Sequence, residues 1–250
     1  MRHNRSFKTA FAGLGFIAGL ILALAPLLPQ RAESATLVGV KPNAVMLPAA
    51  LASEGWRLLQ VPGKAKAQFS QPSRDKIAIE ADRAVAFLYR PLGASLEAKR
   101  KLAWRWRIDE AAPATDLSQA PGDDRSLAVH LIFPVGEDEL GFWERMDLAL
   151  TRLVAPPMAG KVLTYVWGGS HPAGSLLANP YLEARGKIII LRGGEAPLGQ
   201  WVAEEIDFVA NYRRAFGSEP PAPAFVAISA DSDDTGSRIS GALAGLAFDR

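Results

Sequence analysis

Three aspartates near the C-terminus form the densest acidic group of this 250-residue chain. Asp231, Asp233 and Asp234 follow directly after the apolar run 225–229. Alternating carboxylates in a turn suit a hard cation such as calcium, which takes six to eight oxygen ligands. They do not make an EF-hand, because Ala242 stands where that loop needs a bidentate glutamate. The group predicts a possible structural calcium site, with a solvated turn or a catalytic carboxylate group as alternatives.

A second acidic pair, Asp123 and Asp124, stands at the entrance to a predicted strand at 127–133, after a Pro121-Gly122 turn. If the fold brings this pair close to the first group, the two sets can share a cation or a proton. Carboxylates paired across a cleft are also what a glycoside hydrolase uses. We interpret the pair as ligand-binding, and keep a carboxylate-dependent glycan hydrolase or lyase as the alternative.

The residue types give little support for a nucleophilic catalytic site or for a zinc site. Beyond the first few residues the chain has only His130 and His171, and it contains no cysteine. Ser170 lacks the G-x-S-x-G elbow of serine hydrolases, and the two histidines have no recognised zinc spacing. We therefore predict no catalytic residue and lean against an enzyme.

Aromatic side chains are the other candidates for ligand contact, since exposed rings can stack on sugars. Trp104 and Trp106 alternate with arginines along a strand pattern that predicts a core face. Tyr165 and Trp167 belong to the run 162–167, and Trp167 opens into a glycine-rich loop. These last two are the better ligand candidates.

Period-two alternation of apolar residues dominates the chain and predicts a mainly β fold. Short strands divided by Gly, Pro and Asp indicate an antiparallel β-sandwich or jelly roll with one or two short helices. One helix is expected at about 209–216, ending at Gly217, and an amphipathic helical insertion at about 141–155. The predicted strands are 84–89, 102–108, 127–133, 162–167, 187–191, 225–229 and 244–248.

The N-terminal residues have the pattern of a targeting signal. Arg2, Arg5 and Lys8 precede an apolar run at 11–28, which is the pattern of a secretory signal. Residues 1–34 are thus expected to be a signal peptide or a retained membrane anchor, and 35–250 a single β-sandwich domain in the periplasm. The formal net charge of +2 implies no nucleic-acid partner, and membrane contact only through the N-terminal segment. The oligomeric state stays open.

Six motifs follow one another along the chain in a fixed order: Trp104-Arg-Trp, Gly122-Asp-Asp, Leu163-Thr-Tyr-Val-Trp167, Gln200-Trp201, Asn211-Tyr-Arg-Arg-Ala-Phe-Gly217 and Asp231-Ser-Asp-Asp-Thr235. In this order and spacing they resemble the domain-of-unknown-function family 3047 of exported bacterial proteins. The resemblance runs from about 56 to 248 and implies a β-rich sandwich comparable with galactose- or carbohydrate-binding modules, without an established reaction.

The resemblance also implies which polar positions match the family: Asp123, Asp124, Asp231, Asp233 and Tyr212. Arg125 and Ala128 depart from the family pattern, which usually has an aromatic after the Asp pair and an arginine soon afterwards. Any role of that missing arginine is in doubt.

Together these features predict an exported β-sandwich that binds a carbohydrate or another cell-envelope ligand without turning it over. An envelope scaffold or assembly partner that uses the apolar stripe 142–153 is the second alternative to binding. The expected ligand-binding residues are Asp123, Asp124, Tyr165, Trp167 and Tyr212, and the expected metal ligands are Asp231, Asp233 and Asp234.

Overall fold

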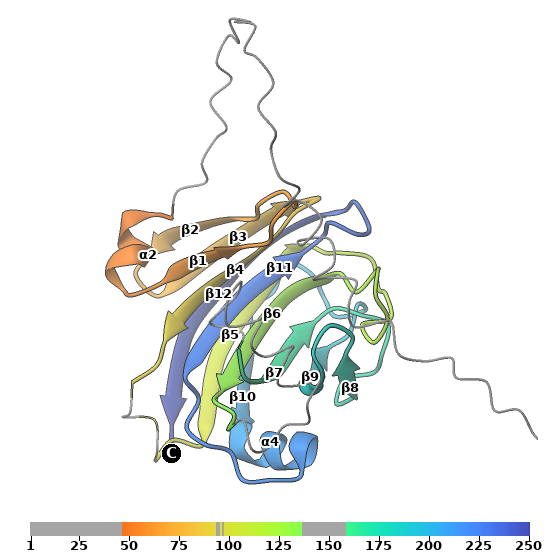
Figure 1. The fold of residues 1–250 in the computed structure, drawn as a ribbon. Helices are drawn as coiled ribbons and strands as arrows, with labels where there is room; N and C mark the ends of the chain where they lie inside the picture. The colour runs from red at the N-terminus through yellow and green to blue at the C-terminus, as the bar shows by residue number, and fades with distance from the viewer. Residues whose placement is uncertain (1–46, 94–95, 97, 137–158) are drawn as a thin grey trace, which may run out of the picture. The chain divides into compact units, whose positions relative to one another are not determined.

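The computed structural model describes residues 47–93, 96, 98–136 and 159–250, which fold mainly into two β-sheets (Figure 1). The seven-stranded sheet has the order β1-β4-β11-β6-β7-β9-β8, and the five-stranded sheet has the order β10-β5-β12-β3-β2. Pairings between these strands are antiparallel except that β7 and β9 run parallel.

The strands of the larger sheet are β1 (Arg57–Gln60), β4 (Val85–Pro91), β6 (Arg125–Phe133), β7 (Lys161–Trp167), β8 (Leu176–Asn179), β9 (Glu183–Arg192) and β11 (Phe225–Asp231). Those of the smaller sheet are β2 (Gln68–Ser73), β3 (Lys76–Asp82), β5 (Lys101–Glu110), β10 (Val202–Asp207) and β12 (Arg238–Asp249). The described helices are α2 (Ala49–Ser53) and α4 (Phe208–Phe216).

The main hydrophobic core lies where the two sheets face each other. Every second residue of β5 is buried, because successive side chains of a strand point to opposite faces. The ring of Trp104 lies 6.0 Å from that of Tyr165, and Trp106 lies 5.6 Å from Trp167, measured between centroids. These contacts join β5 of one sheet to β7 of the other, so aromatic rings close the space between the layers.

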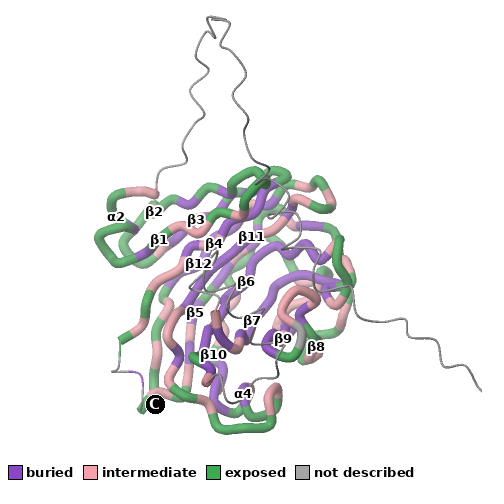
Figure 2. Tube along the Cα trace, in the orientation of Figure 1, coloured by how far each residue is buried: buried purple, intermediate pink, exposed green. Residues whose placement is uncertain are grey.

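The strand β6 lies in the middle of the larger sheet and is buried along its whole length (Figure 2). Its neighbours are β11 and β7. Because both faces are covered, polar side chains on β6 need partners inside the protein. Two polar groups meet this need in different ways, one around Arg125 and one around His130.

Helix α4 begins and ends as its sequence predicts. The Asp207 side chain accepts a hydrogen bond from the Ala210 N–H at 2.8 Å, which caps the first turn. Gly217 takes a left-handed conformation with φ 69° and donates to the Arg213 carbonyl, which ends the helix. The buried face of α4 packs Phe208 and Tyr212 against the end of the core.

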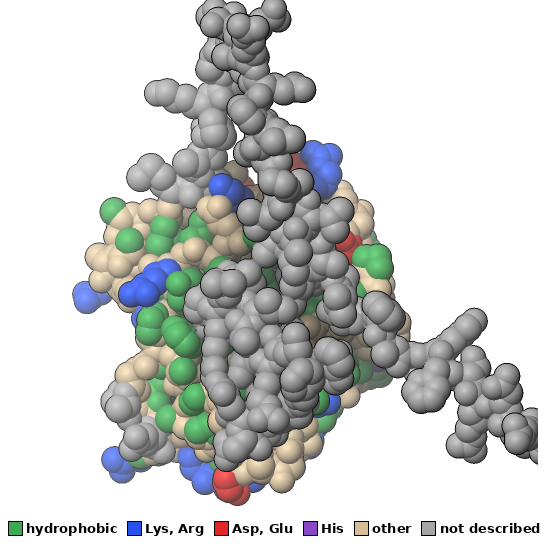
Figure 3. Space-filling view, in the orientation of Figure 1, with side chains coloured by type: hydrophobic (Ala, Val, Ile, Leu, Met, Phe, Trp, Pro, Cys, Tyr) green, Lys and Arg blue, Asp and Glu red, His purple; other side chains and the backbone are tan. Residues whose placement is uncertain are grey.

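The mainly β fold class is confirmed, and a strand lies at each of the seven predicted positions. The strands that were not predicted are β1, β2, β3, β8 and β10; four of them have six residues or fewer, whereas β3 has seven and shows the apolar alternation of a strand. The expected signal or anchor at 1–34 and the helical insertion at 141–155 lie outside the described residues. Within the described part, no helix is long and apolar enough to cross a membrane. Figure 3 shows Lys and Arg side chains at several places along the edge of the visible face.

Candidate functional site

The two acidic groups singled out in the sequence lie against each other at one end of the larger sheet. Asp123 and Asp124 directly precede β6, and Asp231 ends β11, the neighbouring strand. A β-bulge between Ser229 and Asp231 places Asp231 opposite Arg125. The proximity that sharing a cation or a proton would require is therefore present, although the sequence did not predict it. We call the five aspartates 123, 124, 231, 233 and 234, with Arg125 and Lys64, the carboxylate cluster.

Asp124 holds the turn that follows β11. Its carboxylate accepts hydrogen bonds from the Thr235 N–H at 2.7 Å, the Thr235 hydroxyl at 2.5 Å and the Asp234 N–H at 3.3 Å. Asp124 is buried, so these donors replace the water that the carboxylate loses on folding. The oxygens of Asp124 therefore have partners within the protein, and its role in ligand binding stays a prediction.

Arg125 supplies a buried positive charge to the cluster. Its guanidinium donates to Asp123 Oδ2 at 2.9 Å and to Asp231 Oδ2 at 3.3 Å. The Tyr181 hydroxyl donates to the other oxygen of Asp123 at 2.7 Å. Only 6% of the Arg125 side chain and 3% of the Asp123 side chain are exposed. Asp123 is thus held by two partners and is as enclosed as Asp124.

Asp231 has a strongly raised pKa. Burial is the main cause, the nearby Asp233 adds to it and the charge of Arg125 opposes it, and together they bring the pKa of the Asp231 carboxyl to about 8. The Oδ1 atom of Asp231 is buried, and no described residue forms a hydrogen bond with it. At neutral pH a pKa of about 8 favours the protonated form of Asp231, which lies close to the carboxyl groups of Asp124 and Asp233.

One carboxylate oxygen from each of Asp124, Asp231 and Asp233 lies within 4.8 Å of the others. Such a set of hard oxygen ligands can share a proton or contact a divalent cation. Asp234, which the sequence placed in the metal set, instead accepts a hydrogen bond from the Gly122 N–H at 2.9 Å and contacts Lys64. Lys64 also pairs with Asp233. Lys64 and Arg125 thus bring positive charge to the cluster, and bound calcium stays a prediction.

A second buried polar group lies further along β6 and is neutral. The ring of His130 contacts the Thr164 hydroxyl at 3.0 Å through Nδ1 and the Ser229 hydroxyl at 2.9 Å through Nε2. Burial, with a smaller contribution from the charge of Arg125, lowers the pKa of His130 to about 3. A neutral imidazole has one donor and one acceptor, and hydroxyls can satisfy both. We call His130, Thr164 and Ser229 the His130 cluster.

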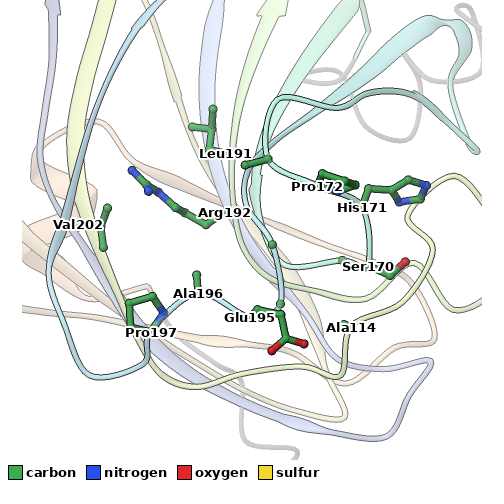
Figure 4. A pocket seen from close by; sticks show the side chains of 14 residues that line it. Ala114, Ser170, His171, Pro172, Leu191, Arg192, Glu195, Ala196, Pro197 and Val202 are labelled. Atoms are coloured by element: carbon green, nitrogen blue, oxygen red, sulfur yellow. The ribbon is translucent and has the colours of Figure 1, made fainter.

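A pocket of about 600 Å³ opens where three loops meet (Figure 4). These loops follow β5, β7 and β9, and they are joined by hydrogen bonds from the Gly194 N–H to the Gly169 carbonyl and from the Ser170 N–H to the Thr115 carbonyl. A Cβ on Gly194 would come within 2.7 Å of Ala114 Cβ, so the close packing of these loops requires glycine there. The pocket has the size of a small-ligand site.

The side chain of Arg192 extends into this pocket and is held in place by hydrogen bonds to Glu204, which also contacts the core residue Trp106. Glu204 accepts from Arg192 Nε at 2.7 Å and from its NH2 group at 3.3 Å. The same carboxylate accepts from Trp106 Nε1 at 3.0 Å. Figure 4 shows the Arg192 side chain extending toward Val202, while the His171 ring points away from Arg192. A guanidinium has five N–H donors, so donors remain for a ligand beside the two bonds to Glu204.

The predicted aromatic ligand residues lie in the core. Tyr165 and Trp167 are 0% and 1% exposed, because the inward face of β7 packs against β5. Tyr212 is 1% exposed, and its ring packs against Phe133 and Phe216. Tyr165 and Trp167 therefore do not form an exposed surface for stacking, and Tyr212, which the family resemblance singled out as a polar position, is buried as well.

Several residues at these sites were not predicted. Lys64 and Tyr181 join the carboxylate cluster from distant turns, and no local pattern in the sequence marks them. Arg192 is the last residue of the strand β9, and nothing in the sequence around it indicated a role in a pocket. The sequence shows that residue 201 is a tryptophan, but it did not predict that 38% of this residue would be exposed.

The fold and these sites define a β-sandwich domain with one buried carboxylate cluster and one open pocket. The model of the family "Protein of unknown function (DUF3047)" matches residues 54–246, and the chain belongs to this family. This confirms the resemblance stated from the sequence motifs. No curated protein matches the chain.

Among solved structures, the chain is similar to the xyloglucanase domain of NopAA, a type three effector from Sinorhizobium fredii in complex with cellobiose. The TM-score is 0.44 with 8% identity, covering 78% of this chain and 93% of that one. It is also similar to the enzymatically active domain of tailspike protein 4 of bacteriophage CBA120, with a TM-score of 0.33 and 10% identity. That match covers 78% of this chain and 19% of the tailspike chain.

Proposed function

We propose that this protein is an exported β-sandwich that binds a carbohydrate or another cell-envelope ligand without turning it over. The observation that carries the proposal is the pocket crossed by Arg192. Sugar recognition needs hydrogen-bond donors and acceptors that are held in place before the ligand arrives, because ordering them on binding costs free energy. The chain of contacts from Trp106 through Glu204 to Arg192 provides such a fixed donor.

The lining of the pocket supports a polar, ring-shaped ligand. Leu191, Ala196 and Pro197 give small apolar surfaces, while Ser170 and Glu195 bring a hydroxyl and a carboxylate. Ligand pockets in proteins combine an apolar lining with a few placed polar groups in this way. An export signal at 1–34 would place such a pocket in the periplasm, where envelope glycans are found.

The test is a glycan array followed by isothermal titration of each positive glycan against variants of the full chain. Arg192→Met is expected to weaken binding at least tenfold, because hydrogen bonds from a charged donor are lost. Arg213→Met is the matched control. Arg213 lies on α4, away from the pocket, and likewise donates two hydrogen bonds to a carboxylate, that of Glu219. Equal affinity of Arg192→Met and wild type for every positive glycan would overturn the pocket as the binding site.

A glycan hydrolase or lyase is the second candidate, and Asp231 is the observation that favours it. A carboxyl group that keeps its proton at neutral pH, close to other carboxylates, has the pairing that glycosidases use for a general acid and its partner. Release of new reducing ends from a bound glycan, lost in both Asp231→Asn and Asp124→Asn, would establish the enzyme. Binding without any release of reducing ends would support the non-catalytic function.

A further inference from the structure

The solvent face of the five-stranded sheet carries an exposed tryptophan. Trp201 directly precedes β10 and is 38% exposed; among the described residues, the other exposed large hydrophobic side chain is Leu198. Trp201, Ala203 and Glu205 are every second residue along the chain, so their side chains point to the same face of the sheet. An exposed indole on the flat face of a sheet offers a ring surface of the kind on which sugars stack.

Small residues beside Trp201 leave a shallow groove of about 430 Å³. Its floor includes Ala103 on β5, Ala203 on β10 and Ala244 with Gly245 on β12. These side chains are too short to fill the surface of the sheet, so the groove crosses three adjacent strands. The rim includes Arg105 and Glu205, a donor and an acceptor for hydroxyl groups.

Two cations lie over the indole. The Lys76 ammonium nitrogen is 5.6 Å and the Arg105 guanidinium carbon 5.4 Å from the centre of the Trp201 ring. Strand register explains this, because Arg105 pairs with Ala244 across β5 and β12, and Ala244 pairs with Lys76 across β12 and β3. The small Ala244 between the two cations gives the ring room to lie over the sheet.

The positive charge at this point is only partly neutralised. Arg105 lies 3.5 Å from Asp75, with both side chains more than half exposed. Within the described part of the chain, no carboxylate forms an ion pair with Lys76. An anionic group placed beside the ring would therefore meet a lysine without a competing acidic partner.

We infer that this surface, made of Trp201, Lys76, Arg105 and the adjacent groove, binds a saccharide that carries a carboxylate, such as a uronic acid. The sugar ring stacks on Trp201, its carboxylate pairs with Lys76 and Arg105, and its hydroxyls contact Glu205. A saccharide fits better than an anionic membrane, because acidic and basic side chains are interspersed here, with Glu205 2.8 Å from Lys101 and Asp75 3.5 Å from Arg105, and do not form a continuous positive layer. The inference takes its ligand class from the proposed function, but uses a different face of the domain.

Isothermal titration of the full chain with trigalacturonate, and with its methyl ester as the uncharged match, tests this site. Trp201→Ala is expected to weaken trigalacturonate binding about tenfold, and Lys76→Gln several-fold. The methyl ester is expected to bind wild type several-fold more weakly than the acid. Arg238→Gln is the control for the loss of one positive charge in Lys76→Gln, because Arg238 is an exposed cation of the same sheet, 3.6 Å from Glu110, and its substitution should leave the affinity unchanged.

The outcomes separate this site from the pocket. Loss of trigalacturonate binding in Arg192→Met but not in Trp201→Ala would support the pocket and overturn this inference. Equal affinity for the acid and the ester, or no trigalacturonate binding by wild type, would overturn it as well, while other glycans still test the pocket. Trp201-dependent binding to phosphatidylglycerol vesicles without binding to trigalacturonate would make the surface a membrane contact instead, and would also overturn it.

Discussion

The carboxylate cluster and the His130 cluster both include side chains of β6 and β11, but polar groups are buried in different ways in the two clusters. Arg125 and His130 are five residues apart on β6, and their partners Asp231 and Ser229 are both on β11. At the strand ends, loops and turns deliver donors and a second cation, so several charges can be held together. In the middle of the sheet only side chains of adjacent strands are within reach, and the group stays neutral.

This difference teaches where a charge can be placed in a sandwich. A buried charge without a partner costs several kcal/mol, whereas a neutral hydrogen-bonded group costs little. The carboxylate cluster meets this cost with Arg125, Lys64 and backbone N–H groups from the turn after β11. The His130 cluster avoids the cost, because burial keeps the imidazole unprotonated.

The largest expected effect is on Arg125. Arg125→Met should lower the free energy of unfolding by about 3–5 kcal/mol, because Asp123 stays buried without its cation and Asp231 loses a hydrogen-bond donor. Urea unfolding at pH 7 measures this. Arg107→Met is the control: Arg107 pairs with Asp109 at the surface, and its loss should cost less than about 1 kcal/mol. Similar costs for the two variants would remove the distinction between charged and neutral clusters.

A smaller loss is expected from the neutral group. His130→Leu should cost about 1–3 kcal/mol, since the hydroxyls of Thr164 and Ser229 lose their partner inside the sheet. The triple variant with Thr164→Val and Ser229→Ala should recover much of that loss, because no unpaired polar group remains. Urea unfolding of both variants gives the comparison. A triple variant less stable than His130→Leu would show that the hydroxyls have other partners.

The pH dependence of stability should have opposite signs for the two clusters. The pKa of Asp231 is raised to about 8 in the folded protein, so its contribution is present below about pH 4 and is lost as the pH rises toward 8. The pKa of His130 is lowered to about 3, so its contribution is present above about pH 6.5 and is lost as the pH falls toward 3.

Between about pH 6.5 and 8 only the Asp231 contribution changes among these two, with a slope of at most about 1.4 kcal/mol per pH unit. Thermal unfolding across this range should show stability falling in wild type and less so in Asp231→Asn. His130→Leu serves as the control, because it should keep the wild-type slope here. An unchanged slope in Asp231→Asn would mean that Asp231 is ionised in the folded protein.

The smallest expected effect concerns the hydroxyl that supports Asp123. Tyr181→Phe removes a hydrogen bond of 2.7 Å and should cost about 1 kcal/mol. Asp123 keeps Arg125, so the carboxylate does not become unpaired. Chemical unfolding of Tyr181→Phe alone and together with Arg125→Met measures their coupling. Strictly additive losses would show that the two donors act on Asp123 independently.

Much of the fold could be predicted because strands leave a local signature. The alternation of Trp104 and Trp106 with arginines predicted the buried face of β5, and Gly217 predicted the end of α4. The pairing of β6 with β11 could not be predicted, since it joins segments about a hundred residues apart. The meeting of Asp124 with Thr235 depends on that pairing and on the bulge before Asp231.

The sequence by itself determined the residue types and the local periods: a mainly β chain, two acidic turns, no cysteine, and an apolar N-terminal run. Only the tertiary structure decided which face of each strand meets the other sheet. For this reason Tyr165 and Trp167 became core residues, while Trp201 stayed exposed. Burial and charge pairing are properties of neighbours in space, and strand pairing brings those neighbours from distant parts of the chain.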